Sequence, residues 1–374
     1  MIRLSTLLAE SKLKMNIPAD IKKIYNLFKK IGKQLYVVGG AVRDAVLGKT
    51  PKDYDLATDA KPDEVEAIAK KGGLKSVPVG KAFGVVNVLV GSNEYEIATF
   101  RKDIGKGRRP DAVDFPDIKG DVKRRDLTIN ALFYDLGRGE IVDLVGGIAD
   151  LKKKQVRTVG SPSERFDEDP LRKLRAVRFA GNIGGKMAPE TWKALQKNPD
   201  ISKVSKERIR DEFIKGIQKA QQPDKYLKML QKLGMFKQIF PGLSVMGLSK
   251  LSTNDYIIQI AYILRNNNPD KIKSKLNGLK YTNKEVNDIW LLLHMTQPAQ
   301  VIKDLPSFKK LQSNSKLTTS QVKEWGKINA SKYVTQLWNW KLSVTAKDAM
   351  DKGLKGKDIG DYIRNKEEEL FISS

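Results

Sequence analysis

The feature that most constrains the fold is a change of pattern near residue 150. Before it, short β-branched runs, glycine turns and helical stretches alternate; after it, long helical patterns follow one another. Strands alternating with helices are typical of a sheet covered by helices, whereas an unbroken series of helices packs without a sheet. The sequence therefore predicts an α+β chain in four parts: a catalytic head with a small mixed sheet (1–150), then an all-α neck with a base-reading helix (151–222), a body (223–300) and a tail (301–374).

Apolar periodicity places the expected elements. In the head it predicts helices over 20–32 and 61–73 and strands over 35–38, 53–57, 84–90 and 94–100. Beyond the head it predicts helices over 163–180, 189–197, 204–218, 223–234, 254–265 and 283–295. Segment 101–122 contains Gly, Pro and mixed charge without a period, and we expect it to be a mobile loop beside the strands.

Composition excludes several kinds of chemistry. The chain has no Cys and one His, which rules out disulfides, thiolate zinc sites, thiol nucleophiles and the His-Asp metal site of a phosphohydrolase. Any reaction must therefore use carboxylates, cations and hydroxyls. Lys and Arg exceed Asp and Glu by 69 to 44, so a net charge of +25 favours a polyanionic partner such as nucleic acid. No apolar run is long enough to predict a membrane helix, and we expect a cytoplasmic protein.

Two aspartates suggest a metal site. Asp53 and Asp55 stand two apart in a predicted strand, so their carboxylates leave the same face. Paired carboxylates repel each other unless a cation joins them, and hard oxygen ligands suit Mg²⁺. Asp-x-Asp alone is more often a solvated turn, but the residues that precede it here favour a metal and phosphate site. Gly39-Gly40 ends a predicted strand and opens a helix that carries Arg43, a pattern that suits a bound phosphate.

These residues carry a family resemblance. The stretch YVVGGAVRDAVLGKTPKDYDLATDAKP resembles the first signature of the class II tRNA nucleotidyltransferases and bacterial poly(A) polymerases. VGKAFGVV, YEIATFR, KRRDLTINALFYD, DLVGG and RFDEDPLRKLRAVRFAG are similar to further segments of that family, in the same order. VTAKDAMDKGLKGKDIGDYI is similar to its RNA-contacting C-terminal segment, and the short start MIRLSTLL resembles phage-encoded members.

The resemblance implies a role for each motif. Asp53 and Asp55 would hold two Mg²⁺ ions, with Glu96 as a candidate third carboxylate beside the commoner reading of a solvent-facing strand residue. Gly39, Gly40 and Arg43 would hold the triphosphate. Ribose recognition would fall to four residues, Arg124, Arg125, Asp126 and Asn130. Their spacing alone fits a salt-bridged helix start equally well.

Base reading would fall to Asp169 and Arg172, placed on one face of the predicted helix 163–180, with Glu168 bracing Arg172. An isolated Asp/Arg pair at this spacing is more often a surface salt bridge. Arg175 and Arg178 would contact backbone or protein. Glu207 and Arg208 would support the pocket, and Lys355 and Lys357 would contact RNA. Three tryptophans are expected in the core more readily than on RNA bases: Trp325, Trp338 and Trp340.

The resemblance implies addition of C, C and then A to the tRNA acceptor end from CTP and ATP. Three alternatives remain open: a poly(A) polymerase of the same family, a restricted variant that adds only C or only A, and a non-catalytic RNA-binding protein on the same scaffold. VGKAFGVV lacks the extra basic residue expected after Lys81 in the polymerase branch, which favours CCA addition. The sequence indicates no protein partner.

Overall fold

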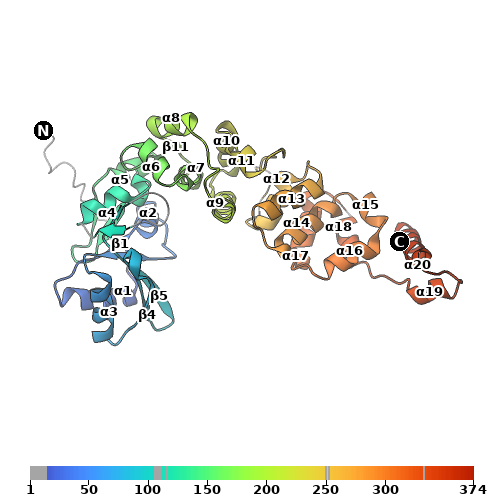
Figure 1. The fold of residues 1–374 in the computed structure, drawn as a ribbon, viewed down its shortest axis with the longest axis horizontal. Coiled ribbons are helices and arrows are strands. Elements are labelled where there is room, and N and C mark those ends of the chain that lie inside the picture. The colour runs from blue at the N-terminus through green and yellow to red at the C-terminus, as the bar shows by residue number, and fades with distance from the viewer. Residues whose placement is uncertain (1–14, 105–111, 115–116, 249–250, 252, 332) are drawn as a thin grey trace. The chain divides into compact units, whose positions relative to one another are not determined.

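The computed structural model describes residues 15–104, 112–114, 117–248, 251, 253–331 and 333–374 (Figure 1). The chain forms two compact units, Met1–Lys203 and Val204–Ser374. The boundary between them lies inside the segment expected to be the neck. The finer division into head, neck, body and tail remains a prediction.

The first unit is built on a seven-stranded sheet of order β3-β4-β5-β2-β1-β8-β9. Its strands are β1 (Leu35–Val38), β2 (Asp55–Thr58), β3 (Lys75–Gly80), β4 (Val85–Val90), β5 (Asn93–Thr99), β8 (Leu132–Asp135) and β9 (Glu140–Asp143). The pair β2–β5 is parallel and every other pair is antiparallel. This mixed sheet, followed by helices, confirms the predicted α+β class. Strands β3, β8 and β9 were not predicted.

Eight helices belong to the described part of this unit. They are α1 (Ala19–Lys29), α2 (Gly40–Val46), α3 (Pro62–Lys71), α4 (Ile118–Arg124), α5 (Gly147–Lys152), α6 (Pro162–Glu168), α7 (Leu171–Asn182) and α8 (Pro189–Lys197), with 3₁₀ turns η2 (Lys81–Phe83) and η3 (Thr128–Asn130). Helix α1 buries Ile21, Ile24 and Phe28, spaced at i, i+3 and i+7, and contacts α3 and β1. Its amphipathic spacing therefore decides how it packs.

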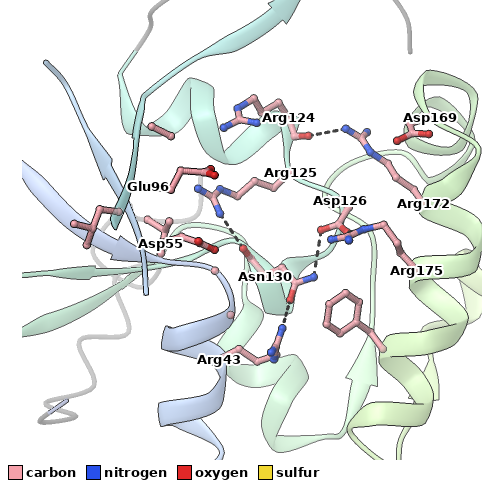
Figure 2. A pocket seen from close by; sticks show the side chains of 16 residues that line it. Arg43, Asp55, Glu96, Arg124, Arg125, Asp126, Asn130, Asp169, Arg172 and Arg175 are labelled. Atoms are coloured by element: carbon pink, nitrogen blue, oxygen red, sulfur yellow. Dashed lines mark hydrogen bonds and ion pairs between the residues drawn. The ribbon is translucent and has the colours of Figure 1, made fainter. Parts of the chain in front are cut away.

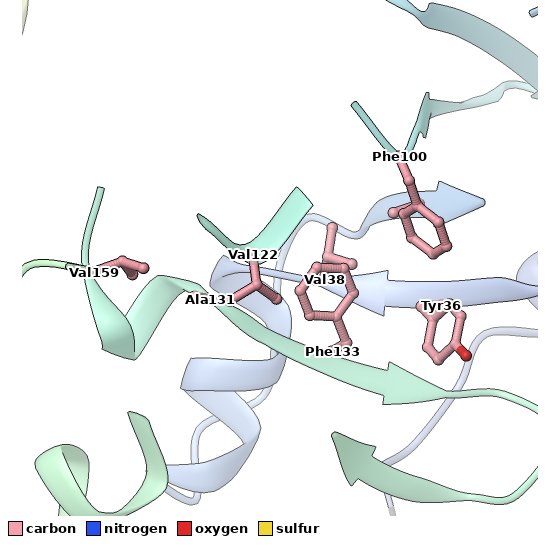
Figure 3. Close-up of a cluster of buried hydrophobic side chains, with 8 residues drawn as sticks. Tyr36, Val38, Phe100, Val122, Ala131, Phe133 and Val159 are labelled. Atoms are coloured by element: carbon pink, nitrogen blue, oxygen red, sulfur yellow. The ribbon is translucent and has the colours of Figure 1, made fainter. Parts of the chain in front are cut away.

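An aromatic core fixes the centre of the sheet (Figure 3). Tyr36 and Val38 point to one face of β1 because side chains alternate along a strand, and Phe133 of β8 packs beside them. The rings of Tyr36 and Phe133 meet edge to face with centroids 6.0 Å apart, and Phe100 lies 6.2 Å from Phe133. Val122 brings α4 onto the same cluster. This packing holds the end of β1, the start of β8 and α4 close together, where the site described below is formed.

The expectation of a structureless loop over 101–122 is wrong in part. Strands β6 (Lys102–Ile104) and β7 (Ala112–Asp114) pair as an antiparallel ladder, and α4 begins at Ile118. The Asp117 carboxylate accepts a hydrogen bond from the Gly120 N–H at 3.0 Å, which caps the helix start. Residues 105–111 and 115–116 lie outside the described residues.

Two further predictions need correction. The segment after residue 150 is not wholly helical, because β10 (Gln155–Val156) pairs in parallel with β11 (Lys186–Met187). The expected helix over 163–180 is broken at Asp169, whose φ of −146° and ψ of 102° are extended. Pro170 explains the break, since proline disfavours helical geometry in the residue before it and cannot donate the next helical hydrogen bond.

The second unit contains only helices among its described residues. They are α9 (Lys206–Lys219), α10 (Pro223–Lys232), α11 (Met235–Ile239), α12 (Tyr256–Leu264), α13 (Pro269–Gly278), α14 (Asn283–Met295), α15 (Pro298–Ile302), α16 (Leu305–Gln312), α17 (Thr319–Ile328), α18 (Tyr333–Asn339), α19 (Ala346–Met350) and α20 (Lys357–Ile372). Trp325 is fully buried and its Nε1–H donates to the Leu292 carbonyl at 2.6 Å, which makes it a core residue. Within the described residues, no helix has the length and apolarity needed to cross a membrane.

Candidate active site

A cleft of about 430 Å³ opens in the first unit beside the end of β1 (Figure 2). Its walls come from the β1–α2 turn, strands β2 and β5, the segment from α4 to η3, and the α6–α7 junction. Most of the predicted site residues line it: Gly39, Gly40, Arg43, Asp55, Glu96, Arg124, Arg125, Asp126, Asn130, Asp169 and Arg172. Residues separated by more than 130 positions in sequence thus share one cleft.

The turn after β1 depends on a glycine. Gly39 has φ +67° and ψ −118°, a backbone conformation that residues with a side chain rarely adopt. Its N–H donates to the Leu132 carbonyl at 3.0 Å. This bond ties the turn to the start of β8. Helix α2 begins at Gly40 and places Arg43 one turn later, where Arg43 Nη1 donates to Asn130 Oδ1 at 2.8 Å.

Two arginines of the cleft share a buried carboxylate. Asp121 of α4 is 1% exposed and accepts from Arg124 Nε at 2.7 Å and from Arg125 Nε at 3.1 Å. Burial alone raises the pKa of Asp121, but the two guanidinium groups and their hydrogen bonds outweigh it, so its pKa is held below the ordinary value. Arg125 also stacks over the Phe133 ring at 4.5 Å. Asp121 therefore orients both arginines from behind the cleft.

Asp126 lies at the centre of a second network. Its Oδ2 accepts from Arg175 Nε at 2.6 Å, and its Oδ1 accepts from Asn130 Nδ2 at 3.3 Å and from the Leu127 N–H at 2.8 Å. Burial raises the pKa of Asp126, but the charge of Arg175 and these hydrogen bonds lower it by more, so the net shift of the pKa is downward. Asp126 is therefore an ionised, fixed acceptor.

The acidic side of the cleft consists of Asp55 and Glu96 on the neighbouring strands β2 and β5 (Figure 2). Burial raises the pKa of Asp55, the nearby Arg125 lowers it, and the charge of Asp53 raises it again, for a net upward shift. Burial and the charge of Asp55 likewise raise the pKa of Glu96. Glu96 thus lines the cleft while its side chain remains exposed.

The predicted strand over 53–57 is misplaced at its start. Strand β2 begins at Asp55, which pairs with Val38, the last residue of β1. Asp53 lies beyond the end of β1, so no strand residue faces it, and it is exposed and does not line the cleft. The expectation that Asp53 belongs to the strand is therefore wrong, although the charge of Asp53 still acts on Asp55.

The carboxylates suit a hard cation. The charge of Asp53 raises the proton affinity of Asp55 and the charge of Asp55 raises that of Glu96, and a bound cation would relieve both effects. No group of three or more His, Asp or Glu side chains in the described part of the chain could hold a metal ion. A site with one or two carboxylates, completed by water and phosphate oxygens, is the usual arrangement for Mg²⁺. The residues present fit such an ion.

The residues predicted to read the base lie at the α6–α7 junction. Asp169 occupies the break between the helices, and its Oδ1 accepts from the Leu171 N–H at 3.2 Å. Arg172 Nη1 donates to Glu168 Oε2 at 2.5 Å, as the predicted brace requires, and Arg172 Nη2 donates to the Arg124 carbonyl at 3.0 Å. Asp169 and Arg172 both line the cleft, although they do not share one continuous helix as predicted.

Other predicted residues lie elsewhere. Glu207 and Arg208 are in the first turn of α9 in the second unit and are not among the residues that line the cleft. Lys355 and Lys357 are exposed, just before and at the start of α20. Their roles remain predictions.

The sequence analysis did not assign Asp121, Arg175 and Phe179 to the site. Arg175 and Phe179 line the cleft, and Asp121 supports it. Their helical spacing offers one signal: Arg175 and Phe179 follow Arg172 at i+3 and i+7, and Asp121 precedes Arg124 and Arg125 at i+3 and i+4.

Comparisons with known proteins point to one family. Residues 35–157 match the family model described as "Poly A polymerase head domain", and residues 185–246 match "Probable RNA and SrmB- binding site of polymerase A". The chain is 43% identical to the CCA-adding enzyme of Bacillus licheniformis over 219 residues, which are 58% of this chain and 53% of that protein. It is 46% identical to the CCA-adding enzyme of Bacillus subtilis over 191 residues, 50% of this chain and 47% of that one.

The aligned region spans about half the length of these curated relatives. The fold is similar over a longer stretch. The crystal structure of the Bacillus stearothermophilus CCA-adding enzyme in complex with CTP superposes with a TM-score of 0.71 and 25% identity, covering 96% of this chain and 93% of that one. The chain therefore contains a region that matches the poly(A) polymerase head domain, and it is similar to CCA-adding enzymes in sequence over about half of its length and in fold over nearly all of it.

Proposed function

We propose that this chain is a CCA tRNA nucleotidyltransferase, which adds C, C and then A to tRNA 3′ ends from CTP and ATP without a nucleic-acid template. The observation that carries the proposal is the single cleft that joins a carboxylate side, a set of arginines and the Asp169–Arg172 pair. The similarity to a CCA-adding enzyme crystallised with CTP supports the same substrate. In the reaction, the terminal 3′-oxygen of RNA bonds to the α-phosphorus while the bond to pyrophosphate breaks.

The triphosphate would bind at the basic end of the cleft. Gly39 and Gly40 carry no side chains, so the backbone turn is open to a close approach by phosphate oxygens. Arg43 lies one turn into α2, with its guanidinium held against Asn130. Arg124 and Arg125, oriented by Asp121, would add the positive charge that a departing pyrophosphate needs.

Asp126 and Asn130 would recognise the ribose. Asp126 is ionised and fixed, so it can accept a hydrogen bond from a 2′-hydroxyl, which a deoxyribonucleotide lacks. Arg124 and Arg125, which precede Asp126 in the same motif, would place this acceptor.

Asp169 and Arg172 would read the base. A carboxylate acceptor next to a forked guanidinium donor matches the amino group and ring nitrogen that C and A share, whereas U and G present the opposite polarity there. Glu168 holds Arg172 in place for this contact.

Nucleotidyltransferases of this family generally use a divalent metal ion. We propose that this ion is Mg²⁺ and that Asp53 and Asp55 hold it, with Glu96 as a third carboxylate. When bound, such ions activate the attacking hydroxyl and neutralise charge on the triphosphate. In the protein itself, Arg125 opposes the burial and the Asp53 charge that raise the pKa of Asp55.

The partner would be the acceptor end of tRNA. Lys355 and Lys357 would hold RNA phosphates from the exposed start of α20, and a supporting role for Glu207 and Arg208 of α9 belongs to the same proposal. The four-part division into head, neck, body and tail belongs to this proposal.

The test is incorporation of single labelled NTPs, with Mg²⁺, into tRNA transcripts that end before CCA, after C and after CC. We expect C on the first two, A on the third, and then no further addition. A long A ladder on any RNA would instead identify a poly(A) polymerase. No incorporation on any transcript, with RNA still bound, would leave a non-catalytic RNA-binding protein.

A further inference from the structure

Helix α7 presents three cleft residues on one face. Arg172, Arg175 and Phe179 follow one another at i, i+3 and i+7 and all line the cleft. The Phe179 ring lies 5.0 Å from the guanidinium carbon of Arg43 and 5.5 Å from that of Arg175. One aromatic ring of α7 therefore contacts both an arginine of its own helix and an arginine of α2.

A chain of hydrogen bonds runs from the same face to α2 (Figure 2). Arg175 Nε donates to Asp126 Oδ2 at 2.6 Å, Asn130 Nδ2 donates to Asp126 Oδ1 at 3.3 Å, and Arg43 Nη1 donates to Asn130 Oδ1 at 2.8 Å. The four residues of this chain lie in four places: Arg175 in α7, Asp126 two residues after α4, Asn130 in η3 and Arg43 in α2. Arg43 is reached from Arg175 by direct contacts alone.

The ion pair between Arg175 and Asp126 orients the hydrogen bonds that follow it through Asn130 to Arg43. Asp126 is a carboxylate with 10% of its side chain exposed, and its ion pair with Arg175 places one oxygen toward α7. The other oxygen is thereby turned toward Asn130 and the Leu127 N–H. Because an amide accepts on one side and donates on the other, Asn130 can present its oxygen to Arg43 only while its nitrogen faces Asp126.

We propose that Arg175 is a positioning residue that couples the base-reading helix α7 to the ribose acceptor Asp126 and, through Asn130, to the triphosphate arginine Arg43. This inference rests on the proposed nucleotide transfer and adds a residue and a route to it. A base bound at Arg172 stabilises the position of α7, and α7 in turn sets the ribose and phosphate contacts. Sugar selection and base selection are then linked through one helix face.

Two substitutions test this role. Arg175→Met removes the donors, and Arg175→Lys keeps the charge but loses the guanidinium fork. We expect Arg175→Met to lower the ratio of kcat/KM for CTP over dCTP by about tenfold, the loss expected for one charge-assisted hydrogen bond. We expect Arg175→Lys to retain part of the CTP over dCTP preference that Arg175→Met loses. The ratio of CTP over UTP should change by less than about threefold, because Asp169 and Arg172 remain.

A double-mutant cycle separates positioning from direct contact with substrate. If Arg175 acts through Asp126, Arg175→Met has little further effect on the CTP over dCTP ratio in an Asp126→Asn background. The double variant also removes both charges together, so it guards against a single variant that fails to fold. Additive losses would overturn the inference, as would an unchanged ratio in a folded Arg175→Met protein.

Arg178→Lys is the matched control, since Arg178 is on the same helix and contacts Phe179 at 4.1 Å without lining the cleft. It should retain the sugar preference. Calorimetric binding of CTP and dCTP to the full chain without tRNA gives a second readout. A wild-type chain that transfers no nucleotide would defeat the proposed function, whereas a wild-type chain that prefers CTP alongside an unaffected Arg175→Met protein would defeat this inference alone.

Discussion

At the scale of single residues, the charged form of Asp55 is disfavoured in the folded protein, and a bound cation would stabilise it. Burial and the charge of Asp53 raise its pKa, with Arg125 opposing them. For a carboxyl whose pKa is raised by folding, the folded chain is stabilised at low pH. That contribution is lost as pH rises from the unfolded value, near 4, through the folded pKa. Near neutral pH, ionised Asp55 therefore costs stability unless an ion is bound.

Asp55→Asn should separate stability from activity. We expect it to lower kcat by about a thousandfold or more, because the amide cannot replace a metal-binding carboxylate. The Tm without metal should stay equal or rise, since the uncompensated charge is gone. Wild-type Tm should increase with added Mg²⁺ and the variant's should not, as followed by circular dichroism. Asp63→Asn, on the exposed surface of α3, is the control. Full activity in Asp55→Asn would contradict the metal assignment.

Asp121 predicts a pH dependence of opposite sign. Its pKa is lowered overall, because Arg125 and Arg124 outweigh the effect of burial. A lowered carboxyl pKa contributes stability that is present above the unfolded pKa and is lost as pH falls through the folded one.

Asp121→Asn should therefore lower the free energy of unfolding at pH 7 by about 3 kcal/mol, since it leaves two guanidinium groups without their carboxylate. The difference from wild type should narrow as pH falls below about 4. Urea unfolding at several pH values measures it. Asp117→Asn serves as the control, because Asn also caps a helix start well. A deficit that stays constant with pH would argue against the ion pairs as its source.

At the scale of elements, the break between α6 and α7 determines how Asp169 and Arg172, the pair proposed to read the base, face the cleft. Pro170 keeps Asp169 extended, so its carboxylate projects from a corner and not from a helix face. Arg172 then starts the new helix, with its guanidinium tied to Glu168 and to the Arg124 carbonyl. Removing Pro170 should let one helix run through the corner.

Pro170→Ala should lower kcat/KM for CTP by roughly tenfold to a hundredfold, since a shift of about 1 Å in a positioning group has effects of this size. Discrimination against UTP should fall as well. Pro189→Ala, at the first position of α8, removes a proline with no such corner before it and should leave selectivity unchanged. Single-nucleotide incorporation assays on a tRNA ending before CCA compare the variants, and an unaltered CTP over UTP ratio in Pro170→Ala would refute the corner's role.

At the scale of the whole molecule, the net charge of +25 should make the proposed RNA binding dependent on salt. Binding to RNA phosphates releases counterions, so the logarithm of the affinity falls linearly with the logarithm of salt concentration. Lysines that contact phosphate contribute to this slope, whereas other lysines do not.

The double variant Lys355→Gln/Lys357→Gln should weaken tRNA binding and reduce the salt slope by about 1.8, the value for two lost phosphate contacts on a duplex. Lys22→Gln/Lys23→Gln on α1 makes the same change in net charge at exposed positions of the first unit. It should leave the slope close to wild type. Fluorescence anisotropy with labelled tRNA from low to high salt supplies the data, and equal slopes for both variants would show that α20 makes no special contact.

The sequence by itself determined the local elements and most of the cleft's membership. Strand β1 matches its predicted bounds, because an apolar run that ends at two glycines leaves few alternatives. The α6–α7 break was not predicted, although Pro170 restricts Asp169 whatever its surroundings and is a local signal for it. The motifs at residues 39–43, 124–130 and 168–172 meet in one cleft, as the family resemblance implied.

Only the tertiary structure decided which residues hold those motifs in place. Arg175 meets Asp126 across 49 positions and Arg43 meets Asn130 across 87, and no local spacing encodes such contacts. The start of β2 at Asp55 likewise depends on where the partner strand β1 ends, which leaves Asp53 outside the sheet. Local patterns record how each segment folds on its own, whereas ion pairs and strand register depend on surfaces that exist only after the segments have packed together.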